Sequence, residues 1–217
     1  MAEITAQMVK DLREKTGAGM MDCKQALAES GGDEDKAVEF LRKKGLKSVN
    51  KRADKVAREG IVHSYIHPGS RIAVLIEMNC ETDFVGRGDD FKNLAKDICM
   101  HIAWSNPKFL SREEVPADVL KQEQEIFRSQ LQPNQEKVAD KIIAGKVEKF
   151  YQENCLLEQL DAKDSSAKKT IQDLLNDLSA KVGEKVVLRR FVRFEVGEGI
   201  EKQAVDYRAE VEAAQRV

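Results

Sequence analysis

Residues 71–86 read RIAVLIEMNCETDFVG, and this stretch decides the fold of the middle of the chain. Its first ten residues place apolar side chains at every second position, as in a half-buried strand. The residues that share this apolar face are Ile72, Val74, Ile76, Met78 and Cys80. Beyond the strand, Gly86 lets the chain turn. Phe84 lies on this turn beside the charged Asp83, a position that does not favour burial in the core. We therefore expect an exposed tip that enters another protein, where burial of one Phe contributes about 1.5–3 kcal/mol.

Two further segments have the same period of two and should complete a small antiparallel sheet. Residues 61–67 form a strand that Pro68-Gly69-Ser70 joins to the one above as a hairpin. Residues 186–196 form the last strand. A helix that begins near Asp89 should cover the sheet, because its apolar residues recur at helical spacing. These residues are Phe91, Leu94, Ala95, Ile98 and Ile102.

The segment that precedes this sheet is predicted to be helical. Residues 1–45 contain three short helical patterns, the last of which ends at Gly45. Such a small core favours a docking module. Residues 46–59 are predicted as a basic helical linker. They contain no aromatic side chain that could stack on bases, so a solvated segment is favoured over one that binds single-stranded nucleic acid.

The second half of the chain adds helices to an α+β core over residues 60–200. Two helices over residues 116–154 are separated by Gln132-Pro133-Asn134 and should form an antiparallel hairpin. A further helix carries the apolar stripe of residues 171–182. A charged helix over residues 201–217 closes the chain.

Composition excludes several classes of protein. Of the 217 residues 34% are charged, and 36 basic residues nearly balance 38 acidic ones. This balance gives no global field for nucleic acid or membrane surfaces, and the longest apolar runs are too short to span a bilayer. The N-terminus lacks the pattern of a signal peptide, so we expect a cytoplasmic protein that binds neither nucleic acid directly nor membrane.

Four cysteines are scattered along the chain without a C-x-x-C pair, which argues against a zinc site and against a disulfide framework. Cys23, Cys80 and Cys99 have apolar neighbours and are expected in cores. Cys155 follows a polar helix end. For this thiol the alternative to burial in a core is exposure to solvent, with a disulfide across a dimer.

Three segments, in order along nearly the whole chain, resemble the elongation factor Ts family. They are Thr16-Gly-Ala-Gly-Met-Met-Asp-Cys-Lys24, Asn79-Cys-Glu-Thr-Asp-Phe-Val85 and Arg193-Phe-Glu-Val-Gly-Glu-Gly-Ile-Glu201. The resemblance implies a guanine-nucleotide exchange factor for elongation factor Tu, without catalytic residues, cofactor or bound metal of its own. It also implies that the three-helix module is a ubiquitin-associated-like domain.

The resemblance also implies which residues contact the partner. The tip formed by Thr82, Asp83, Phe84 and Val85 would enter the G domain of elongation factor Tu and dislocate its magnesium, with Phe84 as the wedge. Secondary contacts would come from the N-terminal module, through Arg13, Met20 and Met21. For the two methionines, packing in a core is the competing interpretation.

The sequence departs from longer members of the family, which carry two related sheet lobes. Only one set of strands is visible, and residues 64–72 resemble the second lobe although the tip belongs to the first. Compact members form dimers, so the resemblance implies a homodimer and a two-to-two complex. His67 matches a partner-contacting histidine of the longer form, although a structural role beside Pro68 is the simpler alternative.

Two other classes of function compete with the exchange factor. An enzyme could use His63, His67, Glu81 and Asp83 as an acid–base cluster, but the phosphate-loop, nucleophile-elbow and paired-histidine motifs are absent from the sequence. A general adaptor could use the three-helix module to bind peptides or ubiquitin-like partners. The exposed Asp83-Phe84 tip discriminates between these functions, because an adaptor that binds through the three-helix module does not require it.

Overall fold

The computed structural model describes residues 4–164 and 168–200, which form an α+β fold with a small antiparallel sheet, as predicted. The helices are α1 (Ala6–Thr16), α2 (Met20–Glu29), α3 (Glu34–Lys51), α4 (Asp83–Arg87), α5 (Asp89–Ser105), α6 (Ala117–Ser129), α7 (Ala139–Asn154) and α8 (Ile171–Val182). Short 3-10 helices are η1 (Arg112–Glu114), η2 (Pro133–Val138) and η3 (Leu156–Glu158). The strands are β1 (Glu59–Ile66), β2 (Ile72–Cys80) and β3 (Val187–Glu195). The predicted C-terminal helix lies outside the described residues.

The sheet has the order β1-β2-β3, with both pairs antiparallel. The predicted apolar face of β2 is confirmed, because Val74, Ile76, Met78 and Cys80 are all buried. The stripe of α5 covers this face, as expected, and α8 and Leu156 at the start of η3 complete the main core. Among the described residues the core therefore lies on one side of the sheet only, and none of their helices covers the opposite face.

The N-terminal helices α1, α2 and α3 pack around a small core of their own. The Thr5 and Asp33 side chains cap α1 and α3 by accepting from the N–H groups of Met8 and Lys36. The predicted helix end at Gly45 is wrong, because α3 continues to Lys51. Gly45 has a packing role instead: a Cβ at this position would lie 3.1 Å from the Cβ of Ala180, so its absence lets α3 approach α8. The remaining part of the predicted helical linker, residues 52–58, is not helical.

The helical hairpin is confirmed over α6 and α7, but the second helix begins at Ala139 and not near Gln135, because η2 intervenes. Phe150 is buried, and Leu120, Phe127 and Ile142 are partly buried. The base of the hairpin is held by Arg112. Its guanidinium pairs with Glu158 and Glu148 and lies 4.7 Å from the ring centroid of Tyr151.

All four cysteines are free and buried, so the alternative that Cys155 is exposed is wrong. Cys155 follows α7, and its backbone pairs with Phe109 in a β-bridge inside the core. Burial raises the pKa of this thiol to about 11. A thiol that is protonated and shielded in this way does not support a disulfide across a dimer.

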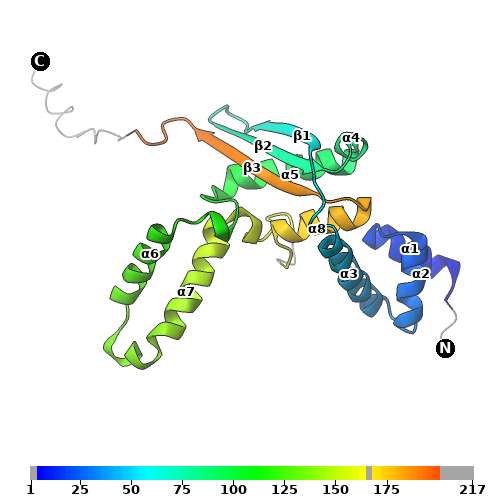
Figure 1. Cartoon of the computed structure of the whole chain (residues 1–217), viewed down its shortest axis with the longest axis horizontal. Coiled ribbons are helices and arrows are strands. Elements are labelled where there is room, and N and C mark those ends of the chain that lie inside the picture. Colours follow the sequence, from blue (N-terminus) through cyan, green and yellow to red (C-terminus); the bar gives the residue numbers. More distant parts are fainter. Residues whose placement is uncertain (1–3, 165–167, 201–217) are drawn as a thin grey trace, which may run out of the picture.

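Figure 1 shows how these parts are arranged along the longest axis of the molecule. The helices α1 and α2 lie toward the same end as α4, and the hairpin α6–α7 extends toward the other end. The contact between α3 and α8 joins the N-terminal module to the core, and the Arg42–Asp173 ion pair at 3.3 Å crosses it.

Candidate functional site

The predicted tip is a short helix, α4, at the end of β2. The side chain of Phe84 is 83% exposed, whereas that of the adjacent Val85 is 9% exposed and belongs to the core. Thr82 and Asp83 are exposed. The side chain of Val85 is therefore not part of the exposed tip, contrary to the expectation from the sequence. It anchors α4, and Phe84 projects from it.

Two glycines bring α4 close to β1. Gly86 is buried, and a Cβ at this position would lie 3.3 Å from the Cα of Gly60. Gly60 has a φ of 143°, which favours glycine, and a Cβ there would lie 2.1 Å from the carbonyl oxygen of Met78. The backbones of α4 and β1 therefore pack directly against each other, without intervening side chains.

The N-terminal end of α4 is held by a residue distant in the sequence. One carboxylate oxygen of Glu184 accepts from the backbone N–H groups of Glu81 and Thr82 at 3.2 and 3.0 Å. The other accepts from the Thr82 hydroxyl at 2.7 Å. Glu184 precedes β3 and is 102 residues from Thr82. No local pattern in the sequence marks it, and sequence reasoning missed it.

Glu81 makes the reverse contact, from the end of β2 back to the loop before β3. Its carboxylate accepts from the backbone N–H of Lys185 at 2.7 Å and from the Arg52 guanidinium at 3.2 Å. The Lys185 N–H and then Arg52 hold the pKa of Glu81 below its usual range. Lys185 also donates from Nζ to the carbonyl oxygens of Ala53 and Lys55, the latter at 3.0 Å. The loop before β3 is thereby tied both to the tip and to the chain that leaves the N-terminal module.

The other polar groups of the tip are ordinary. Asp83 pairs with Arg87 at 2.8 Å across one turn of α4, and both side chains are largely exposed. Burial, followed by the charge of Glu184, raises the pKa of the Cys80 thiol to about 11. This thiol stays protonated and donates to the carbonyl oxygen of Thr82 at 3.0 Å. Cys80 therefore stabilises the turn into α4 and is not a nucleophile.

The residues expected to contact a partner from the N-terminal module are all exposed. Met20 and Met21 begin α2 and are 55% and 76% exposed, so the competing interpretation as core residues is wrong for both. Arg13 is exposed on α1. In Figure 1 the helices that carry these residues lie toward the same end of the molecule as α4.

His67 lies at the other end of the sheet from the tip. It follows β1 at the turn into β2, and its Nδ1 lies 3.0 Å from the Tyr65 hydroxyl. The register pairs Ile66 with Ala73 at this end and Glu59 with Cys80 at the end near α4. Seven residue steps of about 3.3 Å separate these two ends. His67 therefore does not join the tip, and the acid–base cluster proposed for an enzyme is not assembled.

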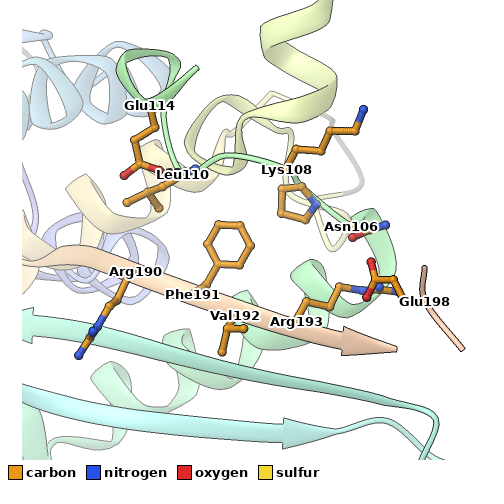
Figure 2. A pocket seen from close by; sticks show the side chains of 10 residues that line it. Asn106, Lys108, Leu110, Glu114, Arg190, Phe191, Val192, Arg193 and Glu198 are labelled. Atoms are coloured by element: carbon orange, nitrogen blue, oxygen red, sulfur yellow. Dashed lines mark hydrogen bonds between the residues drawn. The ribbon is translucent and has the colours of Figure 1, made fainter. Parts of the chain in front are cut away.

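A concave surface lies beside β3, away from the tip (Figure 2), and has a volume of about 500 Å³. Phe191 points from β3 toward the segment that includes Lys108 and Leu110 (Figure 2). The charged ends of Arg190 and Lys108 point away from the space between β3 and this segment. Substrate sites have a few polar groups that converge on one ligand. The charged ends of Arg190 and Lys108 diverge (Figure 2), and none of the predicted site residues lines this surface.

The described residues contain neither a metal-binding cluster nor a membrane-spanning helix. In residues 4–164 and 168–200, no group of three or more His, Cys, Asp or Glu side chains could hold a metal ion. Within the same part of the chain, no helix has the length and apolar character needed to cross a membrane.

Comparison with known proteins assigns these features to one family. A family model described as "Elongation factor TS" matches residues 2–198. The chain is 58% identical over 215 residues to elongation factor Ts of Desulforamulus reducens, covering 98% of both chains. It is 60% identical over 199 residues to elongation factor Ts of Moorella thermoacetica, covering 91% of this chain and 97% of the relative. For the protein of the same name from Syntrophomonas wolfei, identity is 56% over 210 residues, covering 96% and 97%.

Proposed function

Because the chain belongs to the elongation factor Ts family, we propose that it is a guanine-nucleotide exchange factor of the cytoplasm that binds elongation factor Tu and promotes GDP release during translation elongation. The single observation that carries this proposal is Phe84. Its side chain is 83% exposed, and it projects from a helix that buried backbone contacts hold against the sheet. A monomeric protein gains nothing in stability from an aromatic ring in this position.

Exchange requires binding and no covalent chemistry. The GDP of a GTPase is held by Mg²⁺ and by backbone N–H groups around its phosphates. Phe84 enters the G domain beside this site, with Thr82 and Asp83 at its flank and Val85 as the anchor of α4. A displacement of the elements that hold Mg²⁺ and phosphate weakens several charge-assisted bonds together. Exchanger and nucleotide then weaken each other reciprocally, and about 1.4 kcal/mol of coupling changes nucleotide affinity tenfold.

The N-terminal module supplies the second contact with the same G domain. Its exposed Met20 and Met21 form an adaptable apolar surface, and Arg13 adds a charge. The position of α1 and α2 toward the same end as α4 supports simultaneous contact by both elements (Figure 1). His67, at the far end of the sheet, contacts a different part of the partner.

We further propose that the protein is a homodimer, which gives a two-to-two complex. The support is the open face of the sheet, where apolar side chains from all three strands are exposed. They are Val62, Ile66, Leu75, Val192 and Phe194. The register pairs Leu75 with Val192, so this apolar surface continues from one strand to the next. A second copy of the same face would cover it by packing sheet on sheet.

The experiment that tests the exchange function is the release of fluorescent GDP from elongation factor Tu, measured with wild-type protein and with Phe84→Ala. We expect strong acceleration by the wild type and a loss of roughly tenfold to hundredfold in the variant, because one buried Phe contributes about 1.5–3 kcal/mol. Trp104→Ala is the matched control. Trp104 is also exposed, at 76%, but lies on α5.

The outcomes distinguish an exchange factor from an adaptor. Acceleration that Phe84→Ala retains in full would move the exchange mechanism to the N-terminal module. A folded wild-type protein that binds elongation factor Tu without accelerating GDP release would contradict the proposal and favour an adaptor.

A further inference from the structure

Two loops that lie far apart in the sequence exchange carboxylate–amide hydrogen bonds at the base of α4. Glu184, before β3, accepts from the N–H groups of Glu81 and Thr82. In return Glu81 accepts from the N–H of Lys185. We call this arrangement the reciprocal clamp, formed by Glu81, Thr82, Glu184 and Lys185. The Thr82 hydroxyl adds a third bond to Glu184, at 2.7 Å.

The helix α4 depends on this clamp for its orientation. It has only five residues, and a helix of this length is not stable by itself. Thr82 occupies the N-cap position, yet its side chain makes no capping bond to α4 and donates to Glu184 instead. The packing of Val85 and Gly86 holds α4 against β1. The clamp supplies the hydrogen bonds that fix the direction in which the helix begins.

We propose that Glu184 is a positioning residue for nucleotide exchange: it fixes the start of α4 so that Phe84 is presented in one orientation before the partner binds. This inference rests on the proposed function and extends it to a residue outside the tip. Preorganisation matters because an aromatic ring that must be ordered during binding loses part of the free energy that it contributes. Glu184 acts through Thr82, to which it is hydrogen-bonded, and through Phe84.

A positioning role and a purely structural role predict different kinetics. The exposed Met20, Met21 and Arg13 lie outside the clamp. A variant without the clamp therefore keeps these contacts and binds elongation factor Tu with nearly unchanged affinity. Loss of the clamp should therefore lower the GDP release rate at saturating exchange factor and leave the half-saturating concentration nearly unchanged. A loss of folded protein would instead raise the apparent half-saturating concentration and leave the saturating rate intact.

The test compares wild type, Glu184→Gln and Thr82→Val in stopped-flow release of fluorescent GDP across a concentration series, with thermal unfolding of each variant. Glu184→Gln keeps the shape of the side chain and removes its charge, and Thr82→Val removes the hydroxyl donor. Because hydrogen bonds to charged groups are the stronger ones, we expect Glu184→Gln to lower the saturating rate roughly tenfold or more. Glu198→Gln is the control, since Glu198 is an exposed carboxylate near the opposite end of the sheet.

Double variants show whether Glu184 acts through Phe84. If it does, Glu184→Gln lowers the rate in the wild-type background and has little further effect when Phe84→Ala is present. Equal effects in both backgrounds, or a saturating rate that equals the wild type for both Glu184→Gln and Thr82→Val, would overturn the inference. Failure of the proposed function has a different signature, because the wild-type protein itself would not accelerate release.

Discussion

Phe84 and Val85 are neighbours in the chain, and their exposures of 83% and 9% give them opposite roles. A helix directs successive side chains about 100° apart, so α4 buries one residue and exposes the next. The sequence predicted the exposure of the tip, and the helical form of α4 explains why Val85 is buried beside the exposed Phe84. The residue-level consequence is that substitution of Val85 should affect folding of the tip, whereas substitution of Phe84 should affect contact with the partner.

His101 provides a residue-level prediction about pH. It is 4% exposed, and its Nε2 lies 2.9 Å from the Oε1 of Gln159. Burial lowers the pKa of His101 from 6.5, although Gln159 and Asp161 partly oppose this effect. The folded protein then binds fewer protons than the unfolded chain at acidic pH. The stability of the fold should therefore decrease as pH falls below about 6.5, by at most about 1.4 kcal/mol per pH unit for this proton.

Urea unfolding of wild type and His101→Asn between about pH 8 and pH 5 checks this prediction. Asn retains a polar group toward Gln159 and cannot titrate, so the pH dependence of the unfolding free energy should be shallower in the variant. The same slope in both proteins would exclude His101 as its source. His67→Asn serves as the control because His67 is exposed.

At the scale of elements, the position of α4 depends on its direct contact with β1. A side chain at Gly86 would meet the backbone of Gly60 at 3.3 Å and the sulfur of Cys80 at 3.5 Å. The neighbouring group at Gly60 is main chain, which cannot rotate aside. The absence of a side chain at Gly86 therefore sets how closely α4 approaches β1, whereas a Cβ at Gly60 would meet the backbone of β2.

We predict that Gly86→Val lowers the unfolding free energy by about 1–3 kcal/mol, the usual cost of overpacking, and lowers GDP release by displacing Phe84. Gly145→Ala in α7 is the matched control. Nothing lies within 4 Å of a Cβ at Gly145, so alanine there should stabilise the protein by up to about 1 kcal/mol through helix propensity. Denaturant unfolding of both variants gives the comparison, and wild-type stability in Gly86→Val would contradict the close contact.

At the scale of the whole molecule, the described residues 4–164 and 168–200 cover only one face of the sheet. The helices α5 and α8 bury the inner face, whereas Phe194 on the outer face is 67% exposed. The outer face also carries Glu77, which pairs with Arg189 and Arg190 at 2.7 and 2.6 Å. An apolar surface with a charged network at its side has the composition of an interface with a polar rim.

Sedimentation velocity at micromolar concentration tests the homodimer, and we expect a dimer for the wild type. Phe194→Glu should shift it to monomer, because a carboxylate in the centre of an apolar interface would lose its hydration without a partner. Val138→Glu is the control, as Val138 is 50% exposed near the turn of the hairpin. A monomeric wild type would contradict the proposal.

The sequence by itself determined the elements that depend on local periodicity. The alternation in β2, the stripe of α5, the turn at residues 68–70 and the exposure of Phe84 all follow from the order of nearby residues. The motifs at residues 16–24, 79–85 and 193–201 also indicated the family. In these cases the physical cause is short-range, since one face of a strand or helix must be buried and the other hydrated.

Only the tertiary structure decided the features that depend on residues far apart in the chain. Gly45 predicts a helix end by propensity, yet α3 continues through it to Lys51, and Gly45 lies against Ala180 of α8. Cys155 follows a polar helix, and its pairing with Phe109 buries it. Glu184 carries no local signal, yet it caps a turn 102 residues earlier. Such contacts form because folding brings distant groups together and must satisfy each buried donor, and this requirement is invisible in any short window of sequence.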